Sequence, residues 1–141
     1  KLKIIKGKKK IIKLKRKIRL YMIFVKPNFG CNTSKIYKMN KKYSKPILTN
    51  NKLIKFKNLL SLKNDLEQPA FKSYPELKKI KEYLYKMPNI KFARMTGSGS
   101  TIVGYFSTKK HSLTALKIIK KKIQKLLVYL CKNYINFFKL F

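Results

Sequence analysis

Residues 96–101, Thr-Gly-Ser-Gly-Ser-Thr, combine the residue types and spacing best suited to chemistry in this chain. Gly97 and Gly99 let the backbone approach a ligand closely, and exposed N–H groups in such a loop can form a nest that binds an anion. The segment lacks the Gly-Lys-Ser/Thr of a Walker loop, and Ile102 stands where a GxGxxG fingerprint needs its third glycine. The pattern alone leaves two interpretations open, a phosphate-adjacent loop and a plain turn between strands.

The other polar candidates have simpler explanations. Asn64 and Asp65 begin an Asn-Asp-Leu-Glu segment, which predicts a helix cap but could also supply a polar side chain to a site. His111 is the single histidine and is expected on a solvated helix surface, while Cys31 and Cys131 are expected to be inert small hydrophobic residues. These counts exclude a Ser/His/Asp or Cys/His nucleophile set, a disulfide framework and a CxxC metal site. We therefore predict no catalytic residue and no metal ligand in this chain.

The composition describes a single basic domain. The chain has 141 residues, 45% of them hydrophobic, with 37 Lys and Arg against 4 Asp and Glu, giving a net charge of +33. Four acids nearly exclude catalysis by a carboxylate pair, and the absence of any run of 18 apolar residues and of a signal peptide argues against a secreted or membrane-spanning protein. The charge suggests a nucleic-acid or anionic-membrane binder. However, Lys outnumbers Arg 34 to 3, whereas nucleic-acid surfaces favour Arg, so compositional drift in an A+T-rich gene is the preferred explanation.

Hydrophobic periodicity predicts the elements that must position these residues. Strands are predicted at residues 20–25, 90–95 and 101–106, with a hairpin around Gly7 in residues 1–15. Three short helices are predicted: one after Thr33 and Ser34, one over residues 53–62, and one after Asp65. Thr33 and Ser34 are expected to cap the first of them. Residues 40–52 are expected to form a surface loop.

Two longer helices are predicted further along the chain. Pro75 begins one of them, and Ser107 and Thr108 cap the other. Residues 126–141 predict a packed strand with an extension, or alternatively a membrane-surface helix. The inward apolar positions are expected to be Leu77, Ile80, Leu84 and Met87 on the first helix and Leu113, Leu116, Ile119, Ile123 and Leu126 on the second.

This order of elements predicts an α+β fold, a ferredoxin-like split βαβ two-layer domain with its helices on one face of the sheet. We expect residues 17–124 to form this domain. Residues 1–16 are predicted to be the basic hairpin that ends a preceding domain, and residues 125–141 a divergent tail.

Three motifs in order resemble one enzyme family. The motifs are residues 25–30 with Thr33 and Ser34, residues 64–67, and residues 93–101 with Gly104 and Phe106. From about Lys15 to Lys122, this ordered set is similar to the C-terminal half of the 4-diphosphocytidyl-2-C-methyl-D-erythritol kinases, small-molecule kinases of the GHMP superfamily.

The resemblance implies a function. Members of the family use ATP and magnesium to phosphorylate the 2-hydroxyl of 4-diphosphocytidyl-2-C-methyl-D-erythritol, a step of non-mevalonate isoprenoid biosynthesis. It places the loop Thr96, Gly97, Ser98 and Gly99 beside the phosphates and substrate in a cleft between two domains. Asn64 and Asp65 match a motif to which we assign a structural role, capping a helix and fixing the domain.

The chain also departs from the family. The family's main ATP-phosphate loop, catalytic Asp and active-site Lys lie in an N-terminal half that this sequence does not contain, so we expect this fragment to be inactive alone and to need that half as its partner. We expect no specific nucleic acid and no membrane span, and a bacterial cytoplasmic or plastid-type location. A basic nucleic-acid- or membrane-binding module is the alternative. The ending from Lys125 does not match the family, which suggests a frameshift near Gln124.

Overall fold

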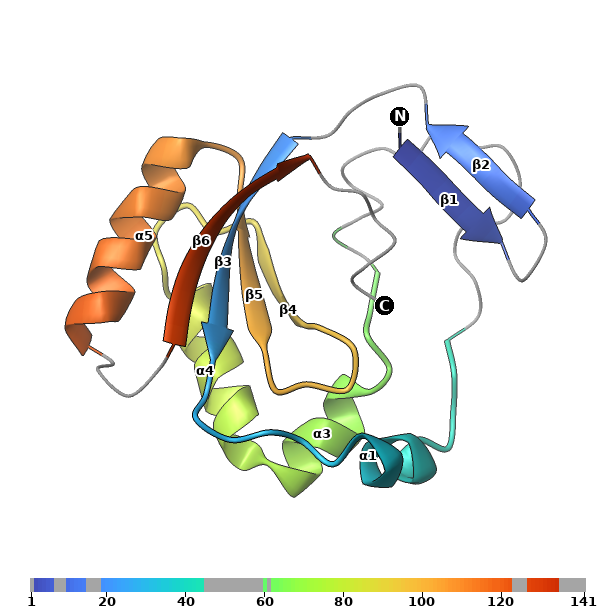
Figure 1. Ribbon diagram of the computed structural model, residues 1–141. Helices are drawn as coiled ribbons and strands as arrows, with labels where there is room; N and C mark the ends of the chain where they lie inside the picture. Colours follow the sequence, from blue (N-terminus) through green and yellow to red (C-terminus); the bar gives the residue numbers. More distant parts are fainter. Residues whose placement is uncertain are drawn as a thin grey trace.

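A computed structural model describes residues 2–6, 10–14, 19–44, 60, 62–122 and 127–134 (Figure 1). The strands are β1 Leu2–Lys6, β2 Lys10–Leu14, β3 Arg19–Lys26, β4 Phe92–Met95, β5 Ile102–Phe106 and β6 Leu127–Tyr134. The helices are α1 Thr33–Met39, α3 Glu67–Ser73, α4 Pro75–Tyr85 and α5 Lys109–Lys122.

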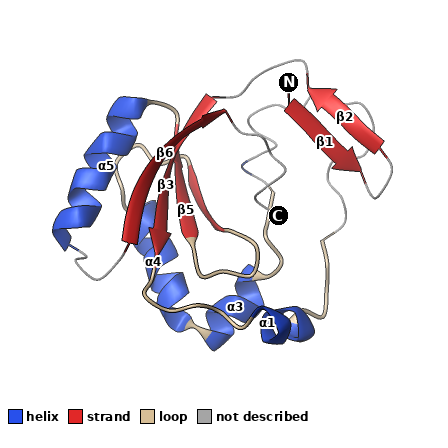
Figure 2. Ribbon diagram, in the orientation of Figure 1, coloured by secondary structure: helices blue, strands red, loops and turns tan. Residues whose placement is uncertain are grey.

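Four strands form one antiparallel sheet in the order β4-β5-β3-β6. Because β3 and β4 both pair antiparallel with β5, they run parallel to each other across it, and α1, α3 and α4 lie in the connection between them. In the same way β5 and β6 flank β3, and α5 connects them. This is the predicted ferredoxin-like split βαβ arrangement, and it belongs to the α+β class (Figure 2).

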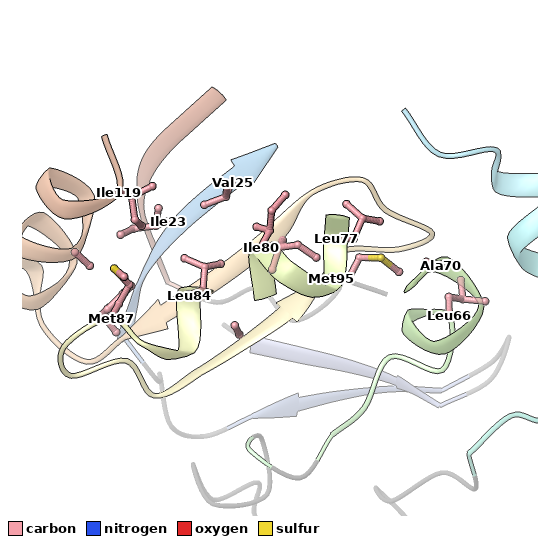
Figure 3. Packing of buried hydrophobic residues seen from close by; sticks show 14 of the residues in the cluster. Ile23, Val25, Leu66, Ala70, Leu77, Ile80, Leu84, Met87, Met95 and Ile119 are labelled. Carbon is pink, nitrogen blue, oxygen red and sulfur yellow. The ribbon is translucent and has the colours of Figure 1, made fainter. Parts of the chain in front are cut away.

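Helices α4 and α5 pack on one face of this sheet, and residues of α1 and α3 complete the main core (Figure 3). Alternate residues of each strand point to the same face, so Ile23 and Val25 of β3 meet Leu84 of α4 and Ile119 of α5 there. The predicted α4 stripe is confirmed, and Pro75 occupies the first turn of that helix. The buried members of the stripe are Leu77, Ile80, Leu84 and, just after the helix, Met87.

The opposite face of the sheet holds a second apolar cluster, built from Leu20, Met22, Phe92, Val103 and Tyr105. The rings of Phe92 and Tyr105 stack with their centroids 4.2 Å apart. Both faces of the central strands are therefore buried, which explains why β3 has a continuous apolar sequence rather than an alternating one.

The amino-terminal hairpin is confirmed, with β1 and β2 paired from Leu2↔Leu14 to Lys6↔Lys10. The predicted strand near the end of the chain is also present, as β6 beside β3. The assignment of β6 to a divergent tail stays a prediction, and so does the assignment of the hairpin to a preceding domain. Most of the helix predicted for residues 53–62, the positions Ile123 and Leu126, and the extension after Tyr134 lie outside the described residues.

The predicted cap is wrong for α1 and confirmed for α5. Thr33 and Ser34 do not cap α1, because the cap is Asn32, whose side-chain oxygen accepts a hydrogen bond from Lys35 N at 2.9 Å. Thr108 does cap α5 as predicted, since its hydroxyl accepts from His111 N at 3.2 Å.

The inward face of α5 is partly the one predicted, since Ile119 is fully buried and Leu116 packs against the core. It is rotated near the start of the helix, where Ser112 and Ala115 are fully buried and Leu113 is 37% exposed. Small side chains at the first two of these positions let the helix approach the sheet closely, which turns Leu113 outward. The same rotation leaves His111 only partly exposed, with its Nδ1 atom buried, so the expected solvated position is wrong. No helix in the described part of the chain is both long and apolar enough to cross a membrane.

The buried phenol of Tyr105 predicts a pH-dependent stability. Burial raises its pKa from 10.0 to about 12, although the nearby Arg94 guanidinium opposes this rise. Between these values the unfolded phenol loses its proton while the folded one keeps it, so the free energy of unfolding falls by about 1.4 kcal/mol per pH unit as pH rises. Urea unfolding from about pH 10 to about pH 12 should show this fall, and Tyr105→Phe should make the curve flatter.

The exposed Tyr37 provides the matched control, and Tyr37→Phe should leave the slope unchanged. If Tyr105→Phe and the unsubstituted chain lose stability equally across this range, the phenol of Tyr105 does not contribute.

Candidate functional site

The turn at residues 96–101 joins β4 to β5 and is closed by its own backbone. Thr96 N donates to Thr101 O at 2.9 Å, and Gly99 N donates to Thr96 O at 2.9 Å. Gly97 and Gly99 have φ values of 49° and 96°, which residues other than glycine rarely adopt. The two glycines predicted to serve a ligand are therefore needed first for the path of the chain.

Gly99 is also required by close packing. A Cβ atom built there would lie 2.9 Å from Cys31 Sγ and 3.1 Å from Met95 Sδ. At Gly97 such an atom would have nothing within 4 Å. Gly99 is thus packed tightly against its neighbours, whereas Gly97 faces open space where a ligand group could approach.

The segment before and at the start of α1 holds one side of the turn. Ser100 Oγ donates to Phe29 O at 2.7 Å, and the hydroxyls of Thr33 and Ser98 lie 2.8 Å apart in a hydrogen bond. Since Thr33 and Ser98 are 65 positions apart, this contact joins two of the motifs seen in the sequence. It places two hydroxyls side by side at the amino end of α1.

The Asn-Asp-Leu-Glu segment holds the other side of the turn. Asn64 Nδ2 donates to Met95 O at 3.0 Å and to Gly97 O at 2.8 Å. Its Oδ1 accepts from Leu66 N at 3.1 Å, and its backbone C=O accepts from Glu67 N at 3.0 Å, whereas the side chain of Leu66, the N-cap residue of α3, makes no cap bond. Asn64 therefore binds backbone N–H groups at the amino end of α3, as a capping role requires, and it also fixes the turn.

Asp65 lies away from the turn. Its carboxylate accepts hydrogen bonds from the backbone N–H and the hydroxyl of Ser44, and these bonds lower its pKa. It lines a cavity of about 950 Å³ between residues 39–44 and 63–69, together with Asn64 and several lysines. That cavity is not lined by the turn itself.

The chemical groups around the turn suit binding and positioning. They are hydroxyls, amides and backbone groups, and the carboxylate of Glu67 accepts a hydrogen bond from Met95 N and pairs with Lys81. No group of three or more His, Cys, Asp or Glu gathers within the described residues. The described part of the chain thus offers donors for an anionic ligand.

The structure brings Thr96, Gly97, Ser98, Gly99 and Asn64 together and leaves Asp65 outside. Sequence reasoning missed three of the groups that fix the turn: the Thr33 hydroxyl, the Cys31 sulfur and the Glu67 carboxylate. Thr33 and Glu67 lie in motifs that carry the family resemblance, whereas Cys31 lies outside them, and spacing alone gave no reason to place any of the three against the turn.

Comparison with known families now identifies the domain. The family model described as "GHMP kinases C terminal" matches residues 45–125, more than half of the chain. The chain belongs to the GHMP kinase family. The matched region includes the turn at 96–101 and the Asn64 segment, so the two contacts of Asn64 with the turn lie inside the family domain.

Curated relatives support the match. A 4-diphosphocytidyl-2-C-methyl-D-erythritol kinase of Pelagibacter ubique is 47% identical over 114 residues, covering 79% of this chain and 41% of the relative. A kinase of the same name from Thermodesulfovibrio yellowstonii is 31% identical over 132 residues, covering 83% and 45%. The chain therefore spans less than half the length of these two relatives.

Solved structures share the fold. A 4-(cytidine 5'-diphospho)-2C-methyl-D-erythritol kinase aligns with a TM-score of 0.58 and 18% identity, over 82% of this chain and 44% of its own. A homoserine kinase from Cytophaga hutchinsonii aligns with a TM-score of 0.62 and 14% identity, over 90% and 46%. Because two kinases with different substrates align equally well, these structures support the fold and do not select a substrate.

Substitutions at three glycines should separate packing from backbone strain. Gly99→Ala should lower the free energy of unfolding by about 2 kcal/mol or more, because it adds a clash with Cys31 to an unfavourable φ. Gly97→Ala should cost about 1 kcal/mol, from φ alone. Gly30→Ala, which meets nothing within 4 Å and has no positive φ, is the control and should be neutral. Urea unfolding measures all three, and equal effects at Gly97 and Gly99 would contradict the packing.

Proposed function

We propose that the chain is the C-terminal part of an ATP-dependent kinase that phosphorylates the 2-hydroxyl of 4-diphosphocytidyl-2-C-methyl-D-erythritol in isoprenoid biosynthesis. The observation that carries the proposal is the 47% identity, over 79% of the chain, to a kinase of that name. The turn at 96–101, held open on its Gly97 side, supports it as a place for a charged ligand.

The residues around the turn fit the phosphates of a nucleotide. Backbone N–H groups and hydroxyls can donate hydrogen bonds to phosphate oxygens, and the hydroxyls of Ser98 and Thr33 lie side by side. When bound, ATP with magnesium supplies the transferred phosphoryl group and the charge that neutralises it. We assign Thr96, Gly97, Ser98 and Gly99 to contact or border the phosphates and substrate, and Asn64 to hold their backbone.

The proposal includes a partner and a location. Phosphoryl transfer depends on positioning and on charge stabilisation at the phosphates, and the family resemblance places the main phosphate loop and the base in an N-terminal half. We propose that this half completes the active site and that residues 1–141 alone are inactive. The curated relatives named above are bacterial, which supports a bacterial cytoplasmic location.

The proposed activity is tested with the complete gene product beside the 141-residue chain. The complete protein should release ADP from ATP only when 4-diphosphocytidyl-2-C-methyl-D-erythritol is present, and ³¹P NMR should show a new phosphomonoester. The chain alone should show neither. Absence of turnover by the complete protein with magnesium would refute the assignment, and turnover by the chain alone would refute the need for a partner half.

A substitution tests the turn's place in the site. In the complete protein, Ser98→Ala should lower kcat/KM about 3- to 10-fold, because one hydroxyl contact with the ligand or with Thr33 is lost. Ser107→Ala removes an exposed hydroxyl after β5 and serves as the control, with kcat/KM unchanged. Equal kcat/KM for both variants would remove Ser98 from the site.

A further inference from the structure

Met95, the last residue of β4, is held at both of its backbone polar groups by the Asn-Asp-Leu-Glu segment. Its N–H donates to Glu67 Oε1 at 2.8 Å, and its C=O accepts from Asn64 Nδ2 at 3.0 Å. Because β4 is an edge strand of the sheet, the backbone groups on its outer side have no strand to pair with. Side chains therefore replace the missing strand directly before the turn.

Glu67 is itself held in place by an ion pair. Its Oε2 lies 2.6 Å from Lys81 Nζ, with side chains only 14% and 21% exposed. Lys81 comes from α4 and also lies over the ring of Phe71, with Nζ 5.7 Å from the ring centroid. One carboxylate thus joins α3, α4 and β4, and the lysine fixes which way its second oxygen points.

A second ion pair, on the surface of α4, provides a contrast. Lys78 and Glu82 are 3.8 Å apart, with side chains 66% and 59% exposed. Such exposed pairs contribute little, whereas a shielded pair with short geometry restricts the orientation of its members. Only the Glu67–Lys81 pair has a member bonded to the turn's supporting strand.

We propose that Glu67, oriented by Lys81, is a positioning residue that keeps the end of β4 and the following Gly97 and Ser98 in the geometry needed for phosphoryl transfer. This inference rests on the proposed kinase function. Two glycines separated by one residue give the turn little stiffness of its own, and small displacements of groups that position a substrate lower the rate strongly. The carboxylate therefore acts through Met95 and does not touch the substrate.

The first test measures the turn without any activity. Glu67→Gln retains an oxygen that can accept from Met95 N but removes the charge that pairs with Lys81, and Lys81→Met removes the pair from the other side. Amide hydrogen exchange in the chain should become about tenfold faster at Met95, Thr96 and Gly99 in either variant. Amides within β3 and β5 should keep their protection.

Two exposed substitutions make matched controls, because Glu82→Gln and Lys78→Met change the same charges on the surface of α4. They should leave exchange of the turn unchanged. Unchanged exchange at Met95 and Gly99 in Glu67→Gln would overturn the proposal. Equal acceleration throughout the sheet would also overturn it, because that result would indicate general destabilisation.

The second test uses the complete protein. Glu67→Gln and Lys81→Met should each lower kcat about tenfold while the KM for ATP changes less than twofold, since binding groups remain and their alignment is lost. The double variant should be no worse than either single one, because both remove the same interaction. A rise in KM alone, or additive losses in kcat, would contradict a positioning role.

The two tests separate the inference from the function on which it rests. If the unsubstituted complete protein does not phosphorylate the cytidyl substrate, the proposed function fails. Hydrogen exchange then still decides whether the Glu67–Lys81 pair holds the turn.

Discussion

The turn at residues 96–101 depends on contacts from outside itself. It is built largely from glycine and serine, so it has few side-chain atoms with which to pack. Its shape is fixed by Asn64, which donates to Met95 O and Gly97 O, and by Ser100, which donates to Phe29 O. A segment with low intrinsic stiffness thus becomes ordered because two distant segments satisfy its backbone and hydroxyl groups.

The sheet places these two segments where they can act. β5 lies between β4 and β3, so the residues that follow β3 come close to the turn that connects β4 to β5, and the Phe29 and Thr33 contacts follow. The outer edge of β4 is covered by side chains, since Glu67 binds Met95 N and Tyr85 donates to Ala93 O at 3.3 Å. This arrangement closes an edge that could otherwise pair with another chain.

Two of the few acidic side chains have specific partners in the fold. Of the four carboxylates, Asp65 binds Ser44 and Glu67 binds Met95 N and Lys81, so two of them connect separate segments of the domain. In a chain with 37 basic residues, a lysine partner for any carboxylate is easily found. What distinguishes Glu67 is the shielding of its pair and its bond to the backbone of an edge strand.

Local sequence determined the elements of this domain. The apolar run of β3, the spacing of Leu77, Ile80 and Leu84, and Pro75 at the start of α4 follow from side-chain periodicity and from the geometry of proline, which act over a few residues. The same local rules, with the order of elements, gave the split βαβ topology, and the ordered motifs led to the kinase family.

Only the tertiary structure decided which groups meet. The contact of Thr33 with Ser98, the bond from Glu67 to Met95 N, the outward Leu113 and the half-buried His111 depend on how far each helix approaches the sheet and how it is rotated. The approach and rotation of each helix are set by packing between distant parts of the chain. The Glu67–Met95 bond joins residues 28 positions apart, and the Thr33–Ser98 bond joins residues 65 positions apart. Periodicity within one element carries no information about them, because it fixes which side of a helix is apolar but not what that side will touch.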